Sequence, residues 1–99
     1  MDRPSSSSRS AERIGVTVRE SAEGHVAEVT VQGPPVTTHR VRVSRAERER
    51  YGGEDVEALV KRSFEFLLAR EANTSILREF DLSTIERYFP EYAREIQRS

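Results

Sequence analysis

The chain of 99 residues contains no cysteine, and lysine is nearly absent, since 16 basic residues include a single lysine, Lys61. The lack of cysteine excludes disulfides, thiolate zinc sites, iron–sulfur clusters and cysteine nucleophiles together. No apolar run approaches the roughly 20 residues of a membrane span. The N-terminus also lacks the apolar core of a secretory signal. We therefore expect a cytoplasmic protein that does not enter a membrane.

The length and the charge balance favour one small domain. The formal net charge is −1, and no segment is basic enough to indicate a dedicated nucleic-acid domain. Residues 1–11 contain five serines and no large aliphatic residue after Met1. Such a segment cannot offset the entropy of ordering, so we expect a Ser-rich disordered tail over 1–11 and a single domain over 12–99.

Apolar and polar residues alternate in three segments of the N-terminal half, which is typical of half-buried strands. If apolar residues share a face, Ile14 pairs with Val31 in the first hairpin and Val29 pairs with Val41 in the second. The pattern predicts a three-stranded antiparallel meander with the second strand in the centre. The alternating apolar positions are Ile14, Val16, Val18, Ala27, Val29, Val31, Val41 and Val43.

Helix signals follow the third strand. Ser44 and Glu47 have the spacing of a capping box, and Gly52 ends that first helix. A long helix over 54–71 has an apolar arc of about 200°, wider than the roughly 100° stripe that packs on one surface. We therefore expect it to contact both the sheet and the C-terminal segment.

The C-terminal segment contains apolar residues in short runs and is interrupted by Pro90. We expect three short helices, near 75–80, 83–89 and 90–97, with a second capping box formed by Ser83 and Glu86. The predicted fold class is α+β: the meander is followed by a short helix, the long helix and the short C-terminal helices, all packed on one face.

The C-terminal half also carries a distinctive string of residues, RSFEFLLARE at 62–71, SIL at 75–77, FDL at 80–82, Ile85 and YFPEY at 88–92. This string resembles a group of short prokaryotic conserved hypothetical proteins of unknown function. Ala72 stands where that group has proline. The string consists mostly of core-type residues, so the resemblance supports the fold and transfers no catalytic residue.

The two histidines are the first candidates for chemistry. The predicted register places His25 opposite Glu20 at one end of the sheet and His39 opposite Val31 at the other, too far apart to bind one metal ion. A hairpin-end pair such as Glu20 and His25 is usually a surface ion pair. Ser63 lies inside the apolar arc and is explained as a packing hydroxyl. We therefore expect no enzyme activity, no cofactor and no metal site.

Two surfaces are left as candidate binding sites. The outward face of the predicted sheet carries four arginines and one acid, Glu28, so an alternative function is a regulator that binds nucleic acid through this face. The face lacks aromatic residues for base stacking. The four arginines are Arg13, Arg19, Arg40 and Arg42.

The second surface is an apolar strip on the long helix that the short C-terminal helices leave uncovered. Phe66, Tyr88 and Tyr92 edge this strip, and an exposed strip of this kind marks a protein partner or a second copy of the chain. The preferred prediction is therefore a small, non-enzymatic protein-binding or assembly module, whose partner is either an unknown protein or the chain itself.

Overall fold

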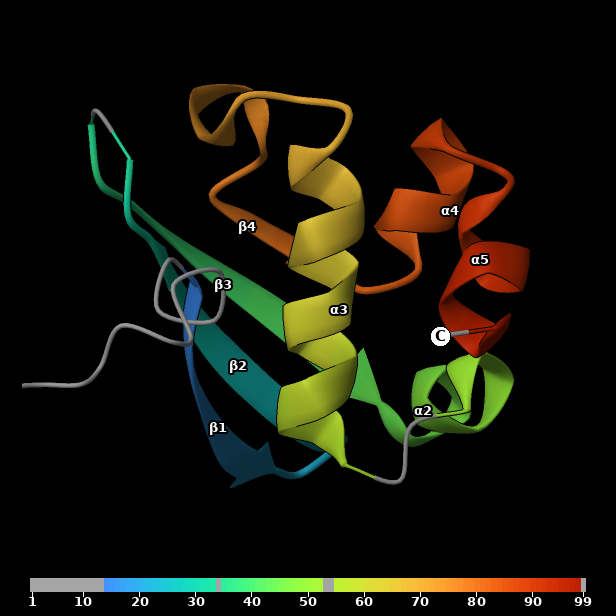
Figure 1. The fold of residues 1–99 in the computed structure, drawn as a ribbon. Coiled ribbons are helices and arrows are strands. Elements are labelled where there is room, and N and C mark those ends of the chain that lie inside the picture. Colours follow the sequence, from blue (N-terminus) through green and yellow to red (C-terminus); the bar gives the residue numbers. More distant parts are fainter. Residues whose placement is uncertain (1–13, 34, 53–54, 99) are drawn as a thin grey trace, which may run out of the picture.

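The computed structural model describes residues 14–33, 35–52 and 55–98. The predicted tail over 1–11 and Arg13 lie outside the described residues. Four strands form one mixed sheet in the order β1-β2-β3-β4, and helices cover one of its faces, with α3 lying across it (Figure 1). The elements are β1 Ile14–Ser21, β2 Gly24–Val31, β3 Thr37–Ser44, α2 Arg45–Tyr51, α3 Val56–Leu68, a 3₁₀ turn η2 Asn73–Ser75, β4 Glu79–Asp81, α4 Thr84–Tyr88 and α5 Tyr92–Arg98.

The first hairpin forms as predicted. Strands β1 and β2 are antiparallel, with Ile14 opposite Val31 and Val18 opposite Ala27. The alternating valines turn toward the helices, and Val29 is fully buried. The predicted antiparallel meander with β2 in its centre is confirmed.

The register of the second hairpin was predicted wrongly by two residues. Val29 lies opposite His39 rather than Val41, and Val31 lies opposite Thr37. A shift of two keeps every residue on its predicted face. The observed register is favoured because Thr37 and His39 are then both buried and hydrogen-bonded. They bond to each other and to Asn73 and Leu77, far along the chain. Apolar pairing alone could not reveal this.

A fourth strand replaces the helix predicted over 75–80. Strand β4 runs parallel to β3, with Phe80 opposite Val41. Backbone hydrogen bonds join the Arg40 amide to the Arg78 carbonyl at 2.7 Å and the Leu82 amide to the Arg42 carbonyl at 2.9 Å. The sheet is therefore four-stranded and mixed, not a three-stranded meander alone.

The helix boundaries follow their caps, with one exception. The capping box of Ser44 and Glu47 forms, and Gly52 ends α2 in the left-handed conformation at φ 77°. Helix α3 starts after Asp55, whose side chain accepts from two backbone amides. The second predicted box is wrong, since the Ser83 side chain caps nothing. The Glu86 carboxylate binds Arg50 and Tyr51 instead.

The long helix α3 has the two partners that its wide apolar arc predicts. It contacts β1 and β2 on one side and α5 on the other. Its buried residues include Leu59, Val60 and Phe64, all fully buried. The core therefore extends from the sheet through α3 to the C-terminal helices. Helices α2, α4 and α5 gather on the side of α3 away from β1 (Figure 1).

Candidate functional site

An apolar groove opens where the C-terminal end of α3, the segment 75–77, β4 and α4 meet. Its volume is about 390 Å³. The groove is lined by Leu67 of α3, Phe80 of β4 and Ile85 of α4. All three side chains are nearly fully buried. The groove is therefore a hollow in the edge of the core, and its floor is apolar.

Two large apolar side chains on the rim of the groove face solvent. Leu77 is 47% exposed and Tyr88 is 67% exposed, and both line the groove. In the described part of the chain, the other exposed large apolar side chain is Val36, which lies in the loop between β2 and β3. Exposed apolar residues are ordinary when scattered, but two beside one apolar groove form a patch of the kind that marks a binding surface.

The groove carries little charge. Glu71 is the one charged side chain among the described residues that line it, and its carboxylate makes no hydrogen bond or ion pair with any of them. The other polar groups are the hydroxyls of Ser75, Thr84 and Tyr88. A bound group would thus meet mainly apolar surface, with one free carboxylate at the side.

One wall of the groove is held by a partly buried chain of polar side chains. The Asn73 side-chain amide donates to the Thr37 hydroxyl at 3.0 Å, and that hydroxyl lies 2.8 Å from His39 Nε2. His39 Nδ1 lies 2.8 Å from the Leu77 carbonyl oxygen, which can only accept. Nδ1 therefore carries a proton, and in a neutral ring Nε2 accepts from the Thr37 hydroxyl.

This arrangement suits a neutral imidazole. Burial lowers the pKa of His39 from its ordinary 6.5, and nearby Arg78 lowers it further, although the hydrogen bond to Leu77 acts in the opposite direction. A second ring proton would also leave the Thr37 hydroxyl without an acceptor. The segment that carries Leu77 is thus anchored to β3 by a neutral histidine.

The opposite wall, α4, is anchored to α2. Both Arg50 and Tyr51 donate to the Glu86 carboxylate, Arg50 through two bonds of 2.8 and 2.9 Å and Tyr51 through one of 2.7 Å. The Ser83 amide donates to Glu47 Oε2 at 2.9 Å. The bonds from Arg50 and Tyr51 lower the pKa of Glu86, Arg50 contributing most. Desolvation and the Glu86 bond raise the pKa of Tyr51 to about 12. Tyr88 therefore projects from a fixed helix.

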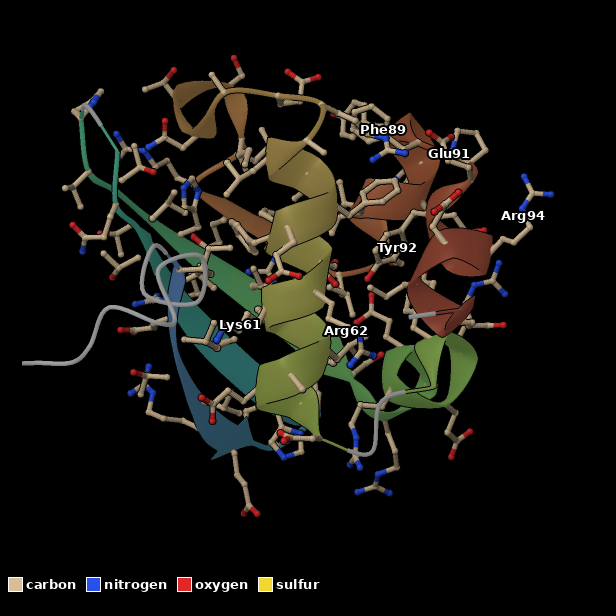
Figure 2. All side chains as sticks on the ribbon, viewed as in Figure 1. Lys61, Arg62, Phe89, Glu91, Tyr92 and Arg94 are labelled. Carbon is tan, nitrogen blue, oxygen red and sulfur yellow. The ribbon has the colours of Figure 1, made fainter. Side chains whose placement is uncertain are left out.

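Of the three residues predicted to edge an exposed strip, Tyr88 alone is exposed. The prediction is wrong for Tyr92, which is fully buried, and for Phe66, which is 9% exposed. Tyr92 points from α5 toward α3, whereas Arg94 on the same helix points outward (Figure 2). The Tyr92 hydroxyl lies 2.6 Å from Ser63 Oγ, which donates to the Leu59 carbonyl. Tyr92 thus belongs to the core.

An arginine covers the outer side of Phe66. The Arg70 guanidinium lies 3.7 Å from the centre of the Phe66 ring and donates to the Phe66 carbonyl. It also pairs with Glu91 at 3.3 Å. The rings of Phe89 and Tyr92 form T-shaped contacts with the same ring. This packing explains why α3 leaves no exposed apolar strip at this point.

The three described arginines of the outer sheet face are all paired. Arg19 and Arg40 both contact Glu28, at 3.1 and 3.4 Å. Arg42 binds Glu79 at 2.7 Å and Asp81 at 2.6 Å. The predicted excess of positive charge is therefore wrong for the described residues, because β4 adds two acids that the three-stranded sheet did not include. Arg13 lies outside the described residues.

The remaining polar candidates, His25 and Ser63, belong to different elements, β2 and α3. His25 lies opposite Glu20 as predicted, and no hydrogen bond joins them. Ser63 bonds back to the Leu59 carbonyl, as predicted for a packing hydroxyl. Residues 14–33, 35–52 and 55–98 contain no cluster of His, Cys, Asp and Glu suited to a metal ion. None of their helices is long and apolar enough to span a membrane.

Comparison with protein-family models, curated proteins and solved structures found no match to this chain. The resemblance of the C-terminal string to a group of prokaryotic proteins therefore stays a prediction, and the site is interpreted from its own geometry.

Most of the groove does not follow from the sequence pattern. The pattern predicts that Ile76, Leu77 and Phe80 lie in one short helix and that all three pack inward. In the structure Ile76 and Phe80 are buried while Leu77 turns to solvent. The alternation of Glu79, Phe80 and Asp81 was the available signal for a strand, but three residues are too few to establish a period of two.

Proposed function

We propose that this protein is a small binding module and that the groove beside Leu77 and Tyr88 takes up apolar side chains of a protein partner. The observation that carries the proposal is the 67% exposure of Tyr88 on a helix held in place by Glu86, next to an apolar groove of about 390 Å³. A fixed, amphipathic aromatic side chain beside a hydrophobic hollow is a common anchor of protein interfaces.

The open shape of the site favours a protein partner over a substrate. Its apolar side chains extend from the floor out to exposed residues on the rim, whereas small-molecule sites bury most of the surface of their ligand. Here the polar side-chain groups are Glu71 and three hydroxyls, and no histidine is among the described residues that line the groove. The proposed activity is therefore binding and not catalysis.

Nucleic-acid binding through the sheet is the weaker alternative. Each described arginine of that face already meets a carboxylate, so a phosphate would have to compete for it. Surface ion pairs of this type contribute only about 0–1 kcal/mol, so they can be broken. They nevertheless cancel the long-range attraction that non-specific binding requires.

The proposal can be tested by selecting peptides from a random display library against the purified protein. We expect enriched peptides to carry two large apolar residues at helical or strand spacing. Leu77→Ser and Tyr88→Ser should each weaken their binding about tenfold or more, because each removes roughly 1.5–3 kcal/mol of apolar burial.

Val36→Ser is the matched control, because Val36 is 55% exposed but does not line the groove. It should leave the affinity of the selected peptides unchanged. Enriched peptides that bind Leu77→Ser and Tyr88→Ser as tightly as the wild type would refute the groove as the binding site, and so would a selection that enriches no sequence.

A further inference from the structure

Building on the proposed function, we infer that the protein partner in the groove is a second copy of this chain, related to the first by a two-fold axis. A two-fold interface uses the same patch on both subunits, so that patch must contain both a projecting group and a hollow that fits it. The groove region contains both. Tyr88 and Leu77 project beside a hollow lined by Leu67, Ile76 and Phe80.

The charges around the groove also complement one another. Arg87 immediately precedes Tyr88 on α4, is exposed, and forms no ion pair with a described residue. Glu71 lines the groove and its carboxylate is likewise unpartnered. In one copy these groups do not meet. When Tyr88 of one copy enters the groove of the other, Arg87 arrives beside that groove's Glu71.

This pairing occurs twice in a symmetric dimer, once on each side of the axis. Each copy supplies one apolar anchor with its arginine and one hollow with its carboxylate. The net charge of −1 means that two copies repel one another very little. The outer sheet face has neither an unpartnered charge among its described arginines nor a comparable hollow beside large exposed apolar residues, so it lacks these complementary features.

The inference predicts a concentration-dependent dimer, which sedimentation velocity of the full chain from low to high micromolar concentration would detect. Tyr88→Ser should raise the dimer dissociation constant at least tenfold, because the side chain is lost on both sides of the axis. Val36→Ser should leave that constant unchanged. Far-ultraviolet circular dichroism and thermal melting of each variant confirm that the fold persists.

Charge reversal gives a test that a general loss of apolar contact cannot mimic. Glu71→Arg alone and Arg87→Glu alone should each weaken the homodimer by placing like charges together twice. The double variant should regain dimerisation, since each reversed pair is again opposite in sign. Mixing the two single variants should likewise yield a heterodimer, in which both pairs are opposite in sign.

The outcomes separate this inference from the proposed function. A chain that stays monomeric throughout the concentration range, yet binds selected peptides through Leu77 and Tyr88, overturns the second copy and leaves the binding module in place. A monomer that selects no peptide overturns both. A dimer that survives Tyr88→Ser and both charge reversals forms elsewhere, and it overturns the inference too.

Discussion

The outer face of the sheet and the groove on the helical side are both open surfaces, but their side chains are satisfied to different degrees. On the sheet face Arg19, Arg40 and Arg42 each meet a carboxylate within 3.4 Å. At the groove Tyr88 presents an apolar ring to water, and Glu71 has no partner among the described residues.

The difference indicates where binding energy is available. A partner on the sheet face must displace internal ion pairs before it gains any contact, and each gain is offset by a loss. A partner in the groove removes apolar surface from water and can pair with the Glu71 carboxylate. It displaces no ion pair between described residues. The more highly charged surface is thus the less favourable binding site.

The largest expected effect is on the free energy of unfolding, and it distinguishes a core tyrosine from a groove tyrosine. Tyr92→Ala should lower the free energy of unfolding by about 3–5 kcal/mol, because it removes a fully buried aromatic side chain and its bond to Ser63. Tyr88→Ala, only four residues away, should change it by less than about 0.5 kcal/mol. Chemical unfolding of the two variants gives both values. Equal losses of unfolding free energy would show that Tyr88 and Tyr92 are buried to the same degree, contrary to the structure.

The contrast between these tyrosines also shows what the sequence can and cannot predict. Both are amphipathic and near the chain end, and their spacing alone does not distinguish them. Tyr92 is buried because Ser63 offers its hydroxyl a partner and Tyr51 packs on its ring, at a centroid distance of 4.9 Å. Those partners are 29 and 41 residues away, so no local pattern records them.

Two local signals predict their part of the structure correctly. The register of β1 and β2 follows from alternating valines, and the α2 cap follows from Ser44 and Glu47. Strand β4 was missed because its pairing with β3 is non-local and its ion pairs with Arg42 join residues 37 and 39 positions apart. Two of the acids that neutralise the sheet face belong to that strand, so one missed element changed the predicted charge of a whole surface.

A smaller effect should appear on acidification, because His39 links the sheet to the groove wall. Its pKa is lowered in the folded state, so below about pH 6.5 the unfolded chain binds more protons than the folded one. The stability that His39 contributes is therefore complete above pH 6.5 and is lost as the pH falls toward the lowered value. Urea unfolding between pH 5 and pH 7.5 measures this change.

His39→Gln supplies the comparison, since an amide can bond to both Thr37 and the Leu77 carbonyl but does not titrate. The variant should be less stable than the wild type at pH 7.5, and its stability should fall less steeply between pH 6.5 and pH 5. Parallel slopes for the two proteins would mean that His39 takes up its proton equally well when folded, contrary to its buried hydrogen bonds.

The last comparison removes the difference between the two surfaces by freeing the arginines of the sheet, at a small cost in stability. The triple variant Glu28→Gln, Glu79→Gln and Asp81→Asn removes the carboxylates that hold Arg19, Arg40 and Arg42. Because these pairs are exposed, the free energy of unfolding should drop by less than about 1 kcal/mol for each.

Binding should change far more than stability in that variant. The wild type should pass through heparin at low salt, whereas the triple variant should be retained and then released as salt rises, because freed arginines attract a polyanion. Glu49→Gln, Glu57→Gln and Glu65→Gln together change the net charge equally without unpairing these arginines, so this control separates the local face from overall charge. Retention of the wild type itself would show that the internal ion pairs do not prevent this face from binding a polyanion, and it would make nucleic-acid binding the leading function.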